Sequence, residues 1–423
     1  MRPLVVLAIK SLWNRRLTAL LTALAVALSV VLILGVERIH QAAQSSFMGS
    51  VAQTDLVVGA RTSPLQLLLF SVFRIGNPTN SISVKTWKHI DSLPEVKWTV
   101  PLSLGDSHRG YPVVATNDSY LEHLRFRQSE SLSFVGGRWF EALHEVVIGA
   151  EVADQLNYSL GDKVVVSHGT GDVTFTHHDE HPFKVVGILR RTGTPVDRSL
   201  HISLEAMEAL HHEEEEHPGH SHGHSHDHHH HHHDHHDHSA QKISAFLVGL
   251  ESPRALLLLQ RQISEYEAEP LTAVIPGRAL QQLWQGLEIV HNTLRLIGAL
   301  VLGVSLLAML LVLLSTLNER RREMAILRAL GASPWAVMGL LLFEALLLAL
   351  SGVVLGGALL ALGLVGLKPW LEAKMGLSLH FGGIASGEWM ILVVILLAAL
   401  VVAFLPAYQA YRRSLADGLR VSL

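Results

Sequence analysis

NERRREMAILRALGAS, residues 318–333, is the stretch that decides the fold of this chain. Its positive charge comes from four arginines, Arg320, Arg321, Arg322 and Arg328, and the amphipathic segment ends at Gly331. Long apolar segments with almost no charge precede and follow it. A basic segment between two membrane spans cannot lie in lipid, so we expect it on the cytoplasmic face, where it can contact a soluble partner.

The apolar residues are concentrated in four segments, each long enough to cross a membrane. The chain has 423 residues, of which 49% are hydrophobic and 17% charged, with a mean hydropathy of +0.32. The segments are 17–36, 297–317, 335–367 and 389–407. About 20 helical residues cross a ~30 Å hydrocarbon core, and a single span in lipid must be helical to pair its backbone. We therefore predict four transmembrane helices.

The distribution of Lys and Arg predicts the orientation, with both termini cytoplasmic. Basic residues precede the first span (Lys10, Arg15, Arg16) and follow the fourth (Arg412, Arg413, Arg420). The predicted parts are a cytoplasmic segment 1–16, an extracytoplasmic domain 37–290, a cytoplasmic loop 318–334, an extracytoplasmic loop 368–388 and a cytoplasmic tail 408–423. A cleavable signal peptide is the alternative for the first span, but twenty uncharged residues favour an anchor.

Composition excludes several functions. The net charge of −4 is too small to indicate a nucleic-acid partner. The chain has no cysteine, which excludes a disulfide framework, a thiolate metal site and a thiol nucleophile. It also lacks the G-x-x-x-x-G-K-[ST] pattern of a P-loop, so we expect any ATPase to be a separate chain.

The extracytoplasmic segment mixes strand-like and helix-like pieces, which predicts an α+β domain. KVVVS (163–167) and FKVVGIL (183–189) are typical of strands, and 204–210 and 255–269 of amphipathic helices. The apolar stretch 58–75 has two interpretations. It is either a helix in the core or an exposed surface that binds an apolar partner or lipid.

A histidine-rich tract interrupts this domain. Sixteen of the 28 residues from 211 to 238 are histidine, and we expect a disordered loop over 211–239. Neutral imidazole is a good ligand for Zn²⁺, Ni²⁺ and Cu²⁺, so the tract predicts loose, multi-site metal binding. The predicted ligands are His211, His212, His217, His220, His222, His224, His226, His228, His229, His230, His231, His232, His233, His235, His236 and His238. A solvated spacer and a pH-responsive loop are the alternatives.

A second histidine cluster, His177, His178 and His181, matches the H-x-x-E-H pattern of some zinc peptidases. That pattern needs a helix, whereas strand-like sequence and Pro182 flank this one. We expect a hairpin tip that could add an auxiliary metal site, and no peptidase.

The organisation resembles the FtsX-like permeases, the membrane subunits of ABC transporters of the MacB and LolC/LolE type. The resemblance rests on the segments 319–323 (ERRRE) and 325–332 (AILRALGA), with 145–149 (EVVIG), 160–162 (LGD) and 183–189 as weaker matches. It implies an α-helical membrane protein with four transmembrane helices and a MacB-like α+β periplasmic core domain between the first and second. The histidine tract is not part of the family pattern.

The resemblance also implies how such a chain works. These permeases pair as homodimers, or with a related permease, and bind a dimer of cytoplasmic ABC ATPases. The loop after the second span acts as a coupling helix, here Glu319, Arg320, Arg321, Arg322, Glu323, Arg328 and Gly331. Many of them carry ATP-driven motion to the periplasm without moving substrate through the membrane, which is called mechanotransmission. Anchoring of the arginines to lipid headgroups is the alternative for this loop.

Two features lie within the predicted spans. Glu344 is a carboxyl group in the third span, where we expect a protonated or hydrogen-bonded packing contact. Gly352 and Gly356 form a GxxxG pair, which predicts a helix-packing or dimer face.

The sequence as a whole predicts a non-catalytic permease subunit in a bacterial inner membrane, linked to acquisition of zinc or a similar divalent metal. We expect no tightly bound cofactor, with Zn²⁺, or Ni²⁺ or Cu²⁺, on the histidine tract. A periplasmic metal-binding protein or lipoprotein is a further expected partner. The alternatives are lipoprotein release or amphiphile efflux, and regulation of a periplasmic cell-wall hydrolase.

Overall fold

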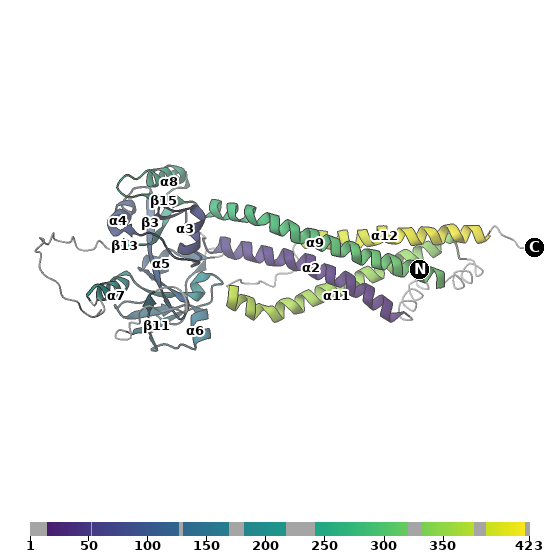
Figure 1. Cartoon of the computed structure of the whole chain (residues 1–423), viewed down its shortest axis with the longest axis horizontal. Helices are drawn as coiled ribbons and strands as arrows, with labels where there is room; N and C mark the ends of the chain where they lie inside the picture. The colour runs from purple at the N-terminus through teal and green to yellow at the C-terminus, as the bar shows by residue number, and fades with distance from the viewer. Residues whose placement is uncertain are drawn as a thin grey trace, which may run out of the picture. The chain divides into compact units, whose positions relative to one another are not determined.

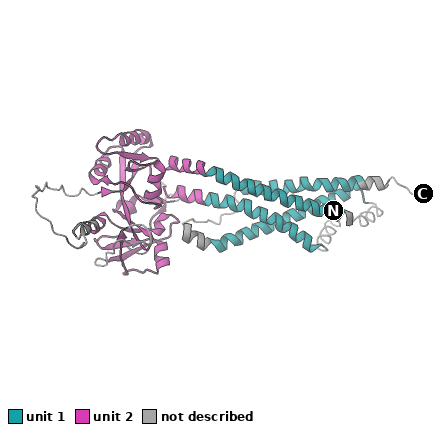
Figure 2. Cartoon of the chain, in the orientation of Figure 1, with its two compact units in different colours: residues 1–42, 287–370, 379–423 teal, residues 43–286, 371–378 magenta. Residues whose placement is uncertain are grey.

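A computed structural model of the chain contains two compact units (Figures 1 and 2). The structure describes residues 15–51, 53–126, 130–168, 182–216, 242–319, 332–375 and 386–418. The helical unit comprises residues 1–42, 287–370 and 379–423, and the α/β unit comprises residues 43–286 and 371–378. The boundary between the units falls within two long helices, α2 (Arg16–Gly49) and α9 (Pro276–Glu319).

The α/β unit is built on a mixed sheet of eleven strands among the residues described. Nine of them follow the order β15-β1-β14-β3-β4-β12-β8-β11-β7, while β10 pairs with β3 and β9 with β11. The strands are β1 (Leu56–Ala60), β3 (Val96–His108), β4 (Tyr111–Thr116), β7 (Phe134–Gly137), β8 (Glu145–Ile148), β9 (Lys163–Val164), β10 (Ser167–His168), β11 (Phe183–Leu189), β12 (Leu200–Ser203), β14 (Ala245–Leu250) and β15 (Leu271–Val274). Two short ladders join β2 (Ile82–Ser83) to β13 (Lys242–Ile243) and β5 (Arg125–Phe126) to β6 (Glu130–Ser131).

Short helices cover the sheet, and hydroxyl side chains cap several of them. Ser63 caps α3 (Pro64–Ser71) and Ser83 caps α4 (Val84–Asp91) by accepting a backbone N–H three residues on. The others are α5 (Ser119–His123), α6 (Ala150–Leu156), η1 (Pro195–Arg198), α7 (Leu204–Glu216), η2 (Pro253–Ala255) and α8 (Leu256–Ser264).

Alternation along the strands fills a core on each face of the sheet. In β1, Val57 belongs to one buried cluster, whereas Leu56 and Val58 belong to another. The stretch 58–75 is a core element, because α3 buries Leu67 and Leu68 completely. Leu65 and Ile75 of the same stretch are 36% and 55% exposed, so the second interpretation, a surface that binds an apolar partner, stays a prediction.

Three element boundaries differ from the sequence expectations. The segment 163–167 splits into β9 and β10, because its two ends pair with different strands, β11 and β3. The helix expected over 255–269 is α8, which ends at Ser264 before the chain turns into β15. Helix α7 continues through Glu216, so its last six residues belong to the histidine tract.

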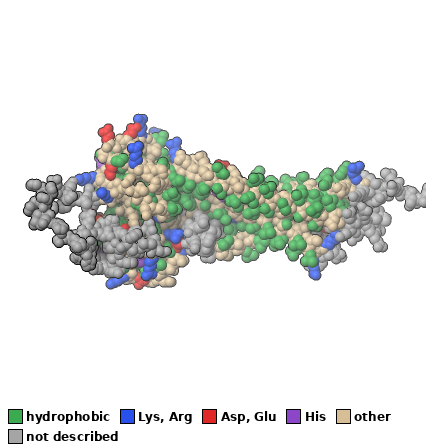
Figure 3. Space-filling model, in the orientation of Figure 1, with side chains coloured by type: hydrophobic (Ala, Val, Ile, Leu, Met, Phe, Trp, Pro, Cys, Tyr) green, Lys and Arg blue, Asp and Glu red, His purple; other side chains and the backbone are tan. Residues whose placement is uncertain are grey.

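The helical unit contains four helices that are long and apolar enough to cross a membrane (Figure 1). They are α2, α9, α11 (Pro334–Met375) and α12 (Ser386–Gly418). Hydrophobic side chains cover much of this unit in the view of Figure 3. Alanines of α11 and α12, such as Ala345 and Ala403, allow close packing against the bulkier Met309 of α9. Glu344 is buried in this unit, with 4% of its surface exposed.

Candidate functional site

The residues predicted to contact an ATPase lie at the edge of what the structure describes. Glu319 is the last residue of α9, whereas Arg320, Arg321, Arg322, Glu323, Arg328 and Gly331 lie outside the described residues. Helix α11 begins directly after them, and the Ser333 hydroxyl accepts a hydrogen bond from the Ala336 backbone at 3.3 Å. The coupling role of this loop stays a prediction.

Most of the predicted metal ligands also lie outside the described residues. These are His177, His178, His181 and the tract from His217 to His238, while His211 and His212 belong to the end of α7. Within the ranges that the structure describes, no group of three or more His, Asp or Glu side chains is placed to hold a metal ion. Metal binding by the tract therefore stays a prediction.

The two glycines of the predicted packing face lie against α2 within the helical unit. A Cβ added at Gly352 would lie 2.7 Å from the Val26 Cβ, and one at Gly356 would lie 2.8 Å from the Ala27 carbonyl oxygen. Neighbouring Gly357 faces open space. The pair thus brings α11 and α2 of one chain into backbone contact, as small residues do in membrane proteins.

A charge cluster, which the sequence did not reveal, joins three helices of the helical unit. Its members are Glu37, Arg38 and His40 of α2, His291 and Arg295 of α9, and Glu388 of α12. Arg38 donates two hydrogen bonds to Glu388, Nε to Oε1 at 2.7 Å and Nη2 to Oε2 at 2.9 Å. The Glu388 side chain is only 3% exposed and that of Arg38 is 24% exposed, so this bidentate pair is partly buried.

The neighbouring residue of α2 binds a different helix. Arg295 donates a hydrogen bond to Glu37 at 2.5 Å, and the His291 Nε2 lies 3.6 Å from the same carboxylate. The rings of His40 and His291 stack with centroids 4.0 Å apart. Consecutive side chains of α2 thus tie it to α9 and to α12. Deeper in the unit, Ser29 and Ser305 repeat the link between α2 and α9 with a buried hydrogen bond of 2.9 Å.

Within the α/β unit, the end of α2 and the start of α9 are part of the hydrophobic core. The Phe47 ring lies 4.5 Å from that of Phe73 and 5.8 Å from that of Trp284. Leu280 of α9 is fully buried in the same cluster. The Ser46 hydroxyl donates to the Gly193 carbonyl at 3.0 Å, just before η1. These contacts fix both helix ends to the domain; we call them the junction core.

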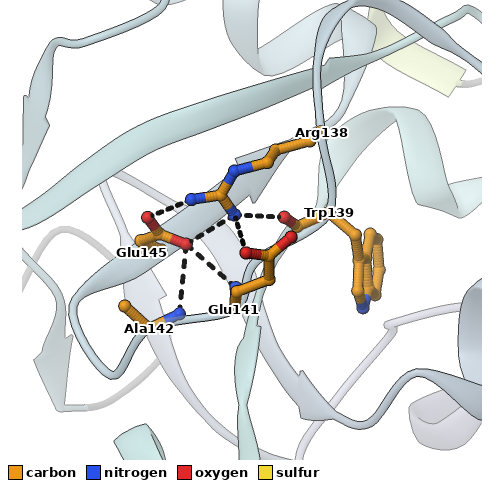
Figure 4. A network of polar contacts seen from close by, with 5 residues as sticks. All are labelled: Arg138, Trp139, Glu141, Ala142 and Glu145. Carbon is orange, nitrogen blue, oxygen red and sulfur yellow. Dashed lines mark hydrogen bonds and ion pairs between the residues drawn. The ribbon is translucent and has the colours of Figure 1, made fainter.

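The EVVIG segment forms β8 and the tight turn after it. Glu145 accepts two hydrogen bonds from Arg138, and its Oε2 also accepts from the backbone N–H groups of Glu141 and Ala142 (Figure 4). The hydrogen bond from Arg138 is the main reason that the pKa of Glu145 falls to about 2. A Cβ at Gly149 would lie 2.3 Å from the Val196 carbonyl oxygen. Glycine is therefore required where β8 meets η1.

One acid next to this turn is buried with incomplete pairing. Glu151 is 2% exposed; its Oε1 lies 3.2 Å from the Arg198 Nε, while its Oε2 has no hydrogen-bond partner among the described residues. Burial raises its pKa to about 7, and the charge of Arg198 opposes the rise.

The α/β unit also contains an open groove of about 1090 Å³. Helix α4 and strand β13 contribute Trp87, Lys88 and Lys242 to its lining, and α7 contributes Glu205. The described residues on both sides of the histidine tract, in α7 and β13, thus line the same groove.

Two family models cover most of the chain. Residues 19–263 match the MacB-like periplasmic core domain, and residues 295–415 match the C-terminal part of the FtsX-like permeases. The first match alone covers more than half of the 423 residues. The chain belongs to the FtsX/MacB-type permease family. Comparison with curated proteins gives no match.

Two solved structures are similar to part of this permease. One is the extracellular domain of the noncanonic ABC-type transporter YknZ from Gram-positive bacteria, with 13% identity and a TM-score of 0.31 over 52% of this chain and 98% of that one. The other is the periplasmic region of MacB from Actinobacillus actinomycetemcomitans, with 9% identity and a TM-score of 0.33 over 56% of this chain and 97% of that one.

Family membership confirms the predicted fold class, four apolar helices with a MacB-like α+β core domain after the first. The chain is a permease subunit of an ABC transporter, and its family works with a cytoplasmic ABC ATPase. It is an inner-membrane protein with a periplasmic domain.

Proposed function

We propose that this permease is a mechanotransmitting subunit that uses the ATPase cycle of its partner to reshape its periplasmic domain, in the service of zinc or similar divalent-metal acquisition. The observation that carries the mechanical part is the junction core. Phe47 near the end of α2 and Leu280 and Trp284 near the start of α9 pack in the core of the α/β unit. A displacement along either helix would therefore act on the packed interior of the domain, which transmits strain.

The charge cluster supports the same proposal from the helical unit. If α2 moved alone, it would break a partly buried bidentate ion pair with α12, in which the Glu388 carboxylate is buried, and an ion pair with α9. Breaking a buried pair is strongly unfavourable, so the three helices are expected to move together. The coupling loop, residues 318–334, would receive the ATPase's movement, with its arginines on the acidic rim of a groove in that partner.

The metal part of the proposal rests on the chemistry and position of the histidine tract. Imidazoles at this density bind Zn²⁺, Ni²⁺ or Cu²⁺ loosely and in many registers. The tract connects α7 to β13, and both elements line the 1090 Å³ groove. Metal captured by the tract would therefore arrive beside a surface that the ATPase cycle reshapes, where a periplasmic metal-binding partner could exchange it.

The alternatives are lipoprotein release or amphiphile efflux, and control of a cell-wall hydrolase. At residues 58–75, Leu67 and Leu68 are in the core, whereas Leu65 and Ile75 are exposed and would contribute to an apolar surface of the kind that the first alternative needs.

The test is the ATPase activity of the reconstituted permease–ATPase complex, titrated with Zn²⁺ in metal-buffered solution. The wild type is compared with a deletion of 211–239 and with a variant of equal length in which the sixteen histidines become serine. The proposal expects submicromolar to micromolar free Zn²⁺ to change turnover in the wild type only. An identical response in all three chains, or none, would move lipoprotein release to first place.

A further inference from the structure

A small cavity beside the junction core is lined by two arginines and, among the described residues, by no acid. It lies within the α/β unit and has a volume of about 20 Å³. Its charged and hydroxyl-bearing lining residues are Arg74, Arg125, Tyr120, Ser50, Thr54, Ser71 and Thr194. No Asp or Glu is among the lining residues that the structure describes.

Arg74 is held at this cavity at an energetic cost. It lies shortly after α3, which ends at Ser71, and has a left-handed backbone with φ of 59°, which residues other than glycine rarely adopt. Its guanidinium donates to the Ser71 carbonyl oxygen and hydrogen-bonds the Tyr120 hydroxyl. Burial lowers the pKa of Arg74, and no carboxylate in the described part of the chain forms an ion pair with it.

The neighbours of Arg74 cannot supply the missing negative charge. Burial raises the pKa of Tyr120 and lowers that of His201 to about 3, so both are neutral near pH 7. Asp197 of η1, the residue after the lining residue Val196, accepts hydrogen bonds from Thr192 and Gly193 instead. The Arg74 side chain is partly buried, and an anion in the cavity would compensate its positive charge.

We propose that this cavity binds a small monovalent anion, a halide ion or the carboxylate of a very small acid. About 20 Å³ of accessible space accommodates roughly one water-sized particle, which excludes larger oxyanions. The bound anion would join Arg74 after α3, Ser50 and Thr54 after α2, and Thr194 before η1. It would stabilise the end of α2 on the domain, independently of any metal or transport substrate.

The test is thermal unfolding of the full-length permease in detergent, with sodium gluconate replaced stepwise by chloride, bromide, formate or sulfate at constant ionic strength. We expect a saturable rise in Tm with the small monovalent anions, roughly 3–5 °C at ten times the Kd. The Arg74→Gln and Arg125→Gln variants should lose most of it. Arg254→Gln, an exposed arginine of η2, should keep it.

The relative potency of the anions shows which kind of anion the cavity binds. If chloride or bromide raises Tm at lower concentrations than formate does, the ligand is a halide ion. If formate acts at lower concentrations, the ligand is a carboxylate. A larger effect of sulfate, or equal effects on the wild type and Arg125→Gln, would mean general salt stabilisation and overturn the proposal. No difference from gluconate would mean that the cavity holds only water. If Arg74→Gln does not fold, the comparison of Arg125→Gln with the wild type across the same anions still tests the proposal.

Discussion

Breaking the ion pair between Arg38 and Glu388 is the most informative perturbation of the helical unit. Arg38→Ala would leave the Glu388 carboxylate, which is 3% exposed, without the two hydrogen bonds of 2.7 and 2.9 Å that now satisfy it. Glu388→Gln keeps the shape and removes the charge. The double variant Arg38→Glu, Glu388→Arg restores a pair of opposite charges, with the acid now on α2 and the arginine on α12.

The expected magnitude follows from the burial of the pair. Removing one partner of a buried pair costs about 3–5 kcal/mol, and the 24% exposure of Arg38 reduces this to roughly 2–4 kcal/mol. The exchanged pair should recover part of that loss, because the bidentate geometry is changed while the charges stay paired. An exposed pair in α8, Arg261 and Glu265, provides the control: exchanging its charges should change stability by less than about 0.5 kcal/mol.

Two assays on the reconstituted complex separate stability from coupling. Thermal unfolding reports the loss of stability. The effect of the permease on the ATPase rate of its partner reports coupling. The single variants should lower Tm and reduce the effect on the ATPase rate, and the double variant should partly restore Tm and the effect on the ATPase rate. If Arg38→Ala has the Tm and the coupling of the wild type, or the exchange is no better than the singles, this pair does not hold the helices together.

Three further predictions concern packing and pH. Gly352→Ala should lower Tm by the equivalent of about 1–3 kcal/mol, because its Cβ would meet Val26, whereas Gly357→Ala on the same helix should be neutral or stabilising; equal Tm values for the two would contradict the packing. His201 has a folded pKa of about 3 against 6.5 unfolded, so its contribution is intact above pH 6.5 and declines with acidification, by about 2 kcal/mol at pH 5; a His201→Phe chain should show a flatter Tm profile from pH 7 to 5. The pKa of Glu151 is shifted in the opposite direction, to about 7, so the burial of this acid lowers stability as pH rises from about 4.5 to 7. Glu151→Gln should therefore stabilise the protein more at pH 8 than at pH 5, by up to roughly 3 kcal/mol, seen as a larger difference in Tm from the wild type. The same difference in Tm at both pH values would show that Glu151 is ionised throughout.

The parts of the fold that depend on local sequence could be predicted. Four apolar segments are enough to place the four long helices, because crossing a bilayer demands about 20 uncharged residues. The strand at 183–189 and the start of α7 after Ser203 follow from alternation and capping, which act over a few residues. The order of the apolar segments, together with the motif at 318–332 and the weaker matches in the extracytoplasmic segment, indicated the family that the family models confirm.

The charge cluster and the junction core could not be predicted, because they join residues far apart in sequence. Arg38 and Glu388 are separated by 350 positions, and each alone is an ordinary charge at the end of an apolar segment. Adjacent opposite charges at 37 and 38, directly after twenty uncharged residues, are the only local signal. Phe47 and Trp284 carried no signal of their partners, since an aromatic residue near a helix end can equally face lipid.

In the mechanism that we propose, ATP-driven motion reaches the periplasmic domain through α2 and α9. Since the chain has no cysteine, single cysteines at Lys88 and Glu205, two exposed residues on different sides of the groove, can be spin-labelled directly. The distance between the labels is measured by pulsed electron paramagnetic resonance in the complex without nucleotide, with ATP trapped on a hydrolysis-deficient ATPase, and with ADP. We expect a distance distribution that shifts in the ATP state and returns with ADP, and a smaller shift in the Phe47→Ala chain. The same distribution in all three states, in a complex that binds and hydrolyses ATP, would contradict this mechanism.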